Sequence, residues 1–278
     1  MSFLEKVKSL HNQATESMLG SRRLVFHHVP KCAGTSVSRA LRLRYALSQA
    51  ALHAPSSRTA VMQQKPDLSE EEYYQRQLTF REQFLFYHLA MDTKCIIGHI
   101  IFSESAHQQY ADKYLFATCL REPMQRLLSN YRFSTKSYDP KLNEEDLSAY
   151  LESFEGQNQV TTYTRYFFGG PLPSNTSRQF ALEQAKGNLS KFDVVGTTEN
   201  LAQFARDLGS KLRLPLAFGR HNQGADSNAN ILESLSEPLQ QRIRSLCEQD
   251  IEIYQFATER VSSGQTQSAT DKVLRGPA

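Results

Sequence analysis

The chain has 278 residues, of which 40% are hydrophobic and 22% charged, a balance typical of a globular protein with one large α/β domain or two small ones. Its net charge of +3 is too small to indicate a nucleic-acid partner, although it allows a local basic pocket for an anionic ligand. No apolar run reaches the roughly 18 residues that a membrane span needs. Four cysteines without paired spacing predict free thiols, not a disulfide or zinc framework.

The two ends of the chain differ from its middle. Residues 1–20 carry spaced charges and no continuous apolar core, which predicts a short amphipathic helix and not a signal peptide. Residues 262–278 are polar and rich in Gly, Ser and Thr, which predicts a flexible tail. We therefore expect one domain over residues 1–261, and the missing signal and anchor together with free thiols predict a cytoplasmic location.

Short apolar runs alternate with helical patterns along the middle of the chain. This alternation predicts βαβ units and a mostly parallel central sheet flanked by helices, with ligands bound beyond the carboxyl ends of the strands. The turn-rich polar stretch at residues 53–80 predicts an excursion from that core. Strands are predicted within residues 22–29, 94–102, 113–121 and 191–196, and helices within residues 35–52, 70–90, 122–134, 198–212 and 236–261.

The loop after the first predicted strand, "PKCAGTS", has the composition of an anion-binding turn. Gly34 permits close backbone approach, and Thr35 and Ser36 open the next helix, where free N–H groups and the helix dipole attract an anion. Lys31 adds a mobile positive charge. Because this lysine precedes the glycine, the loop does not match the nucleoside-triphosphate pattern G-x-x-x-x-G-K-[ST]. A purely structural strand-to-helix turn is the alternative.

A second set of basic residues follows the third predicted strand, in "LREPMQRLLS". Arg121 ends the strand, Pro123 opens a helix, and Arg126 and Ser129 share one face of that helix. An arginine and a serine placed in this way can hold one phosphate from two sides. Alone, these residues are better explained as solvated helix-end charges and a small packing serine, but next to the first loop they predict a ligand with two separated anionic groups.

The two motifs together resemble those of the PAPS-dependent sulfotransferases, in particular the branch with carbohydrate sulfotransferases such as the heparan sulfate 2-O-sulfotransferases. "VPKCAGTS" and "LREPMQRLLS" carry the resemblance, and "FDVVGTTENL" and "EQDIEIYQFA" extend it from residue 22 to residue 257. It implies a three-layer fold like that of P-loop NTPases. It also implies transfer of a sulfuryl group from 3′-phosphoadenosine 5′-phosphosulfate (PAPS) to a hydroxyl group, with no metal.

The resemblance also implies roles for individual residues. Lys31 would contact the bridging or 5′-phosphate oxygen and stabilise charge on the departing phosphate, and Ala33, Gly34, Thr35 and Ser36 would supply the rest of that site. Arg121 and Ser129 would hold the 3′-phosphate. Asn222, in "GRHNQG", would lie on a loop near the nucleotide.

The proton acceptor has to be chosen among eight histidines. His99 stands in the otherwise apolar run "CIIGHIIF", where composition alone favours a buried core residue. The resemblance reverses this preference, because the heparan sulfate 2-O-type branch has its basic histidine in a Gly-His-Val stretch at the same place. His99 is therefore the predicted base, and His88 and Glu104 are the alternatives.

The segment "EGQNQVTTYTRYFFGG" is rich in amides, hydroxyls and aromatic rings that could bind a sugar. We expect acceptor contacts from Asn158, Gln159 and Arg165, although a polar loop before a buried aromatic cluster fits equally well. The acceptor would be a carbohydrate or glycolipid, or another alcohol. Two other functions stay open: a kinase-like nucleotide-binding enzyme, disfavoured by the lysine position, and a non-catalytic nucleotide-binding protein on the same fold.

Overall fold

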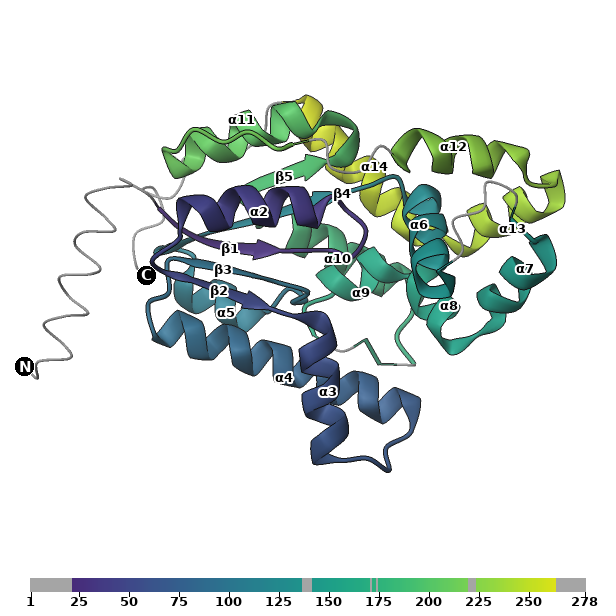
Figure 1. The fold of residues 1–278 in the computed structure, drawn as a ribbon, viewed down its shortest axis with the longest axis horizontal. Helices are drawn as coiled ribbons and strands as arrows, with labels where there is room; N and C mark the ends of the chain where they lie inside the picture. The colour runs from purple at the N-terminus through teal and green to yellow at the C-terminus, as the bar shows by residue number, and fades with distance from the viewer. Residues whose placement is uncertain (1–21, 137–141, 171, 174, 220–223, 264–278) are drawn as a thin grey trace, which may run out of the picture.

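A five-stranded sheet forms the centre of the computed structural model, which describes residues 22–136, 142–170, 172–173, 175–219 and 224–263. Every strand pairs in parallel with its neighbours, and the spatial order is β2-β3-β1-β4-β5 (Figure 1). The predicted α/β class with a mostly parallel sheet is thus confirmed. The strands are β1 (Arg23–His27), β2 (Gln49–Leu52), β3 (Cys95–Gly98), β4 (Tyr114–Leu120) and β5 (Val194–Thr197).

Helices cover both faces of the sheet, which gives the three layers expected of a P-loop-like fold (Figure 1). Alternating side chains of β1 enter different cores because successive residues of a strand point to opposite faces. Leu24 and Phe26 pack with α2 and α11, whereas Val25 packs with the helices of the other face. The first layer contains α2 (Gly34–Arg44) and α11 (Leu201–Leu212); the second contains α4 (Glu70–Ala90), α5 (Glu104–Tyr110), α9 (Thr162–Phe167), α10 (Arg178–Leu189) and α14 (Glu248–Ser262).

A third group of helices lies beyond the carboxyl ends of the strands (Figure 1). These helices share a hydrophobic core of their own, separate from the two cores that cover the sheet. They therefore form a wall beside the edge where the sequence analysis expects the ligand. The group contains α6 (Pro123–Thr135), α7 (Glu144–Glu152), α8 (Phe154–Val160), α12 (Gly224–Ser234) and α13 (Glu237–Leu246).

One predicted element is wrong. A single helix was expected over residues 35–52, but α2 ends at Arg44 and residues 49–52 form the edge strand β2. The alanines of this short run have high helix propensity, yet its backbone pairs with β3, and this tertiary pairing overrides the local preference. Because β2 is short and partly exposed, it lacks the apolar run that marks the other strands.

The predicted excursion contains helix. Residues 54–64 form α3 (Ala54–Gln64), which packs against α4 and projects away from the sheet, whereas α4 itself contributes to the core on one face of the sheet (Figure 1). A capping box between Ser69 and Glu72 begins α4 at Glu70. The 3₁₀ turn η1 (Thr198–Asn200) links β5 to α11.

Other sequence predictions have mixed outcomes. All four cysteines are free and buried, as their spacing predicts. The predicted N-terminal helix over residues 1–20 and residues 264–278 of the predicted tail lie outside the described residues. Within the described part of the chain, no helix is both long and apolar enough to cross a lipid bilayer.

Candidate active site at the carboxyl edge of the sheet

Three predicted site residues meet at one edge because the strands are parallel. Lys31 lies in the loop after β1, His99 directly follows β3, and Arg121 directly follows β4. The strands β3, β1 and β4 are neighbours, and adjacent strands lie about 4.8 Å apart. The fold therefore brings together side chains that are up to 90 positions apart in the sequence (from Lys31 to Arg121).

The loop after β1 is held in an unusual backbone conformation. Lys31 and Ala33 both adopt the left-handed region, with φ of 67° and 54°, which costs a residue other than glycine about 1–3 kcal/mol. Helix α2 then begins at Gly34 without a capping side chain. The N–H groups of Gly34, Thr35 and Ser36 donate to no acceptor within the described chain, and they form the predicted anion cradle.

Gly34 has a further reason to be glycine. A Cβ atom at this position would lie 1.5 Å from Nε2 of His28, so the imidazole ring of His28 occupies the space of any side chain. The same ring stacks on His99, with 4.3 Å between the ring centroids. His28 thus fills the gap between the anion loop and the predicted base.

Arg121 is the strongest sign of an anionic ligand. Its side chain is buried, with 8% exposed, yet Nε and Nη2 have no hydrogen-bond partner among the described residues. The pKa of the Lys31 amine is lowered by burial and further by the nearby Arg121 guanidinium. A guanidinium with buried, unpaired donors close to a second cation is costly unless an anion satisfies it. The 3′-phosphate that the sequence analysis assigns to Arg121 fits this requirement.

Helix α6 presents the other residues of the second motif. Glu122 accepts hydrogen bonds from the backbone N–H groups of residues 124 and 125, and Pro123 occupies the first turn, as predicted. Ser129 is half-buried and makes no side-chain hydrogen bond to another described residue, so its hydroxyl can serve a ligand. Arg126 instead is almost fully buried and donates to the side chain and backbone carbonyl of Gln159, which gives it a structural role.

His99 has the tautomer that a general base needs. Its Nδ1 lies 2.8 Å from the backbone oxygen of His28. A carbonyl oxygen only accepts, so Nδ1 carries the hydrogen and Nε2 carries the lone pair. Burial and, to a smaller extent, the charge of Arg81 lower the pKa of His99 to about 4, with that hydrogen bond acting in the opposite direction. The imidazole is therefore neutral near pH 7 and free to accept a proton.

The two alternative bases have other surroundings. His88 precedes β3 and its Nδ1 lies 3.1 Å from Oγ1 of Thr93, so it stands at the amino edge of the sheet. Glu104 forms an ion pair with Lys191. Neither residue shares a contact with the loop after β1, whereas His99 is bonded to that segment through His28.

The predicted acceptor residues lie on two short helices, α8 and α9, not on a loop. Gln159 is engaged by Arg126 through its side-chain oxygen. The Arg165 guanidinium lies 4.3 Å from the ring centre of Tyr74 on α4, and its Nε is buried without a partner in the described chain. Asn158, on α8, is half-buried. Asn222 lies outside the described residues.

Sequence reasoning missed three buried residues that hold the site. Arg81 donates to the backbone oxygen of His99 at 3.2 Å and to Oγ of Ser57 at 3.3 Å. Tyr163 contacts the backbone of Arg121, and Asp250 accepts hydrogen bonds from the start of α9. The only signal for Asp250 was its place in "EQDIEIYQFA"; nothing in the sequence marks the other two.

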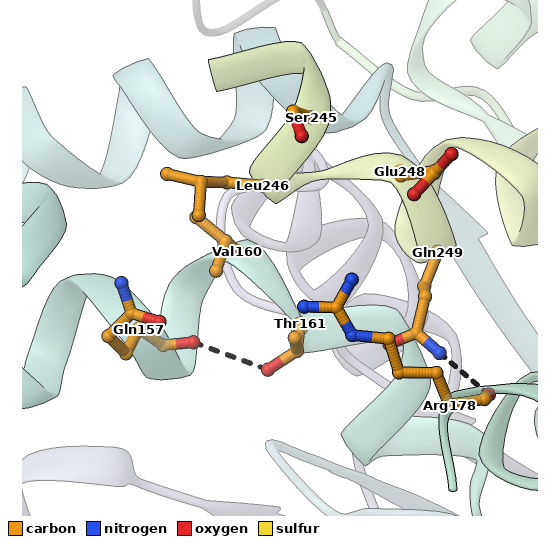
Figure 2. A pocket seen from close by; sticks show the side chains of 8 residues that line it. All are labelled: Gln157, Val160, Thr161, Arg178, Ser245, Leu246, Glu248 and Gln249. Atoms are coloured by element: carbon orange, nitrogen blue, oxygen red, sulfur yellow. Dashed lines mark hydrogen bonds between the residues drawn. The ribbon is translucent and has the colours of Figure 1, made fainter. Parts of the chain in front are cut away.

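A small pocket elsewhere does not serve this chemistry. It has a volume of about 70 Å³, far below the roughly 300 Å³ at which ligand pockets begin, and no predicted site residue lines it (Figure 2). Within it, Gln249 donates through Nε2 to the backbone oxygen of Arg178 at 2.7 Å. Its walls are Gln157, Val160, Thr161, Arg178, Ser245, Leu246, Glu248 and Gln249.

The parallel sheet flanked by helices defines an α/β protein of the P-loop-like class, with the lysine-bearing turn and the buried arginine at the carboxyl edge of the sheet. The profile of the sulfotransferase family matches residues 18–257, so this chain belongs to that family and is a transferase of sulfur-containing groups. No individually curated protein matches the chain.

Proposed function

We propose that the protein transfers a sulfuryl group from PAPS to a hydroxyl group of a carbohydrate or another alcohol. The observation that carries this proposal is the pair of unpartnered, buried N–H donors of Arg121 beside the uncapped lysine loop. A nucleotide with a 3′-phosphate and a 5′-phosphosulfate supplies one anion to each of these two places. The family assignment supports the reaction type.

Different residues would bind the two anionic ends of the nucleotide. Arg121, with the free hydroxyl of Ser129, would hold the 3′-phosphate. The N–H groups of residues 34–36 and the amine of Lys31 would hold the phosphosulfate end. Lys31 now lies with Nζ 4.1 Å from the ring centre of Phe133, a partly exposed position from which a flexible lysine can reach the loop.

The proton moves to His99. As the bond from sulfur to the acceptor oxygen forms, the bond from sulfur to the phosphate oxygen breaks. Nε2 of His99 takes the hydroxyl proton, because Nδ1–H is already committed to His28. Lys31 stabilises the negative charge that develops on the departing phosphate oxygen.

The acceptor side suits a molecule with hydroxyl groups and apolar ring faces. Tyr74 offers an aromatic ring and Arg165 offers hydrogen-bond donors beside it, and Asn158 offers a further donor from α8. A sugar ring, in a glycan or a glycolipid, has this combination of surfaces. The four free cysteines fit a cytoplasmic enzyme.

Isothermal calorimetry with the product nucleotide, 3′-phosphoadenosine 5′-phosphate, tests the donor. We expect tight binding that needs the 3′-phosphate and does not change when magnesium is added. Preference for ATP with magnesium would reject the proposal and favour a kinase-like enzyme. Binding of the bisphosphate without turnover in a screen of hydroxylated acceptors would favour a non-catalytic nucleotide-binding protein.

A further inference from the structure

Tyr163, near the start of α9, contacts both anion-binding segments. Its ring is fully buried, and its Oη lies 2.9 Å from the backbone nitrogen of Arg121. The same hydroxyl also contacts the backbone oxygen of Arg121 and lies 3.5 Å from Sγ of Cys32, in the loop after β1. One side chain therefore joins two segments that are 89 positions apart, from Cys32 to Arg121.

The hydrogen bonds of this hydroxyl group are complete. A tyrosine hydroxyl has one hydrogen to donate and two lone pairs that accept. The hydrogen goes to the Arg121 carbonyl, one lone pair receives the Arg121 N–H, and the other can receive the Cys32 thiol hydrogen. Burial raises the pKa of the Tyr163 hydroxyl, so it stays protonated and keeps this donor.

Arg121 depends on this contact because it lies past the end of its strand. The last paired residue of β4 is Leu120, opposite Thr197 of β5, and on the other side β1 pairs only as far as Thr118. No neighbouring strand thus takes up the N–H and C=O groups of Arg121. Tyr163 pairs with both, which fixes the direction in which the Arg121 side chain leaves the sheet.

The backbone at Tyr163 is hydrogen-bonded to Asp250 of α14. The N–H of Tyr163 donates to Oδ2 of Asp250 at 2.8 Å, and the N–H of Thr164 donates to Oδ1 of the same carboxylate at 3.0 Å. Asp250 is buried, with 1% exposed. These bonds to a buried carboxylate anchor the backbone at Tyr163 to α14, independently of the two loops that its hydroxyl contacts.

We propose that Tyr163 is a positioning residue that sets the separation of the two anion sites, and so selects a nucleotide phosphorylated at both the 3′ and 5′ positions. This inference rests on the proposed function. It adds a specificity role for a residue that touches neither phosphate. Tyr163 acts through the backbone of Arg121 on one side and through Cys32 of the lysine loop on the other.

The test compares Tyr163→Phe with Tyr45→Phe by calorimetry. Tyr45 is also fully buried, and its hydroxyl donates to the backbone oxygen of Arg22 at 2.6 Å, at the opposite edge of the sheet. The probes are 3′-phosphoadenosine 5′-phosphate and adenosine 5′-phosphate. In Tyr163→Phe we expect the bisphosphate Kd to rise about tenfold and the monophosphate Kd to change less than about threefold. In Tyr45→Phe we expect both to stay unchanged, although Tm falls in both variants.

A double-mutant cycle separates positioning from general damage. If Tyr163 acts through Arg121, Tyr163→Phe should add little to the loss of bisphosphate affinity in Arg121→Ala. Equal losses for the two nucleotides, or full additivity in the cycle, would overturn the inference. Wild-type protein without preference for the bisphosphate would instead reject the proposed function, so the two failures can be told apart.

A second variant covers the case in which Tyr163→Phe does not fold. Cys32→Ala removes the contact between Tyr163 and the lysine loop, together with the weak thiol contact to the backbone oxygen of Pro30, and leaves the bonds between Tyr163 and Arg121 in place. We expect the preference for the bisphosphate over the monophosphate to fall by about twofold to threefold, because a thiol hydrogen bond is weak. An unchanged preference in this variant would contradict the link between the two sites.

Discussion

Two regions of the proposed site are built differently: the donor edge, which contains Arg121 and the loop after β1, and the acceptor side, which contains Arg165 and Tyr74. At the proposed donor edge, Tyr163 pairs with both the backbone N–H and the backbone C=O of Arg121, whereas Nε and Nη2 of the Arg121 side chain have no partner among the described residues. On the acceptor side, Arg165 rests on the ring of Tyr74, a contact between two separate helices that includes no backbone bond. A rigid donor edge suits one fixed nucleotide, whereas an acceptor surface made of side chains can differ between members of a family without disturbing the sheet.

The largest effect should come from His99→Ala, because His99 is the proposed general base. We expect kcat to fall about a thousandfold, since general-base catalysis commonly contributes a factor of that order. Binding of 3′-phosphoadenosine 5′-phosphate should stay within about twofold of wild type, because His99 contacts the carbonyl and the ring of His28 and makes no hydrogen bond to Lys31 or to residues 33–36. Steady-state kinetics and calorimetry on the same preparation measure both quantities.

His88→Ala is the matched control for that experiment. His88 is also a partly buried histidine, but it lies at the amino edge of the sheet beside Thr93. Its removal should leave kcat near the wild-type value. A thousandfold loss in His88→Ala together with an active His99→Ala would assign the base to His88.

The second-largest effect is expected for Arg121→Ala, which removes the proposed 3′-phosphate contacts and leaves the acceptor side unchanged. The bisphosphate should bind on the order of 100-fold more weakly, because two charge-assisted hydrogen bonds are lost. Adenosine 5′-phosphate should be almost unaffected. Arg42→Ala, at an exposed arginine on the far end of α2 that donates to Gln49, is the control and should change neither. Equal weakening of both nucleotides would contradict the assignment of the 3′-phosphate to Arg121.

The difference between the two regions also explains what the sequence could predict. The donor loops are local motifs: Lys31 and Gly34 lie within four positions, and Arg121 and Ser129 follow a single strand end. Their side chains and spacing are therefore visible without the fold. Four of the five strands were likewise visible as apolar runs, and only the alanine-rich β2 was taken for helix.

The residues that support the site could not be predicted, because their roles come from contacts across the chain. Tyr163 reaches Arg121 over 42 positions, and Asp250 reaches Tyr163 over 87. Arg81 looks like one more charge on the helical pattern of residues 70–90, yet it is buried against the His99 carbonyl. No local pattern distinguishes such residues from ordinary core or surface positions.

Arg165→Ala should weaken binding of the acceptor without changing binding of the donor nucleotide. We expect KM for the acceptor to rise about tenfold, from the loss of the cation–π contact with Tyr74 and of hydrogen bonds to the acceptor. The Kd for 3′-phosphoadenosine 5′-phosphate should be unchanged. A donor Kd that rises in parallel with the acceptor KM would show that the two regions are not independent.

The smallest expected effect is the response of the base to acid. Burial, and then the charge of Arg81, lower the pKa of His99 to about 4, so it stays neutral in the free enzyme down to well below pH 6. Between pH 7 and pH 5.5, kcat/KM should therefore fall by less than about twofold, whereas a histidine with the ordinary pKa of about 6.5 would lose about tenfold.

The lowered pKa of His99 also determines how the stability of the fold changes with pH, and one of its causes, Arg81, can be tested by substitution. A histidine whose folded pKa lies below its unfolded value stabilises the fold fully above pH 6.5, and this contribution is lost as the pH falls toward 4. Arg81→Gln should raise the pKa that governs the acid limb of kcat/KM. This pKa should stay below 6.5, because burial is the larger cause of the lowered pKa and remains in the variant. An acid limb near pH 6.5 in the wild type would mean that the working base is more exposed than His99, and that the border between donor edge and acceptor side is open to water.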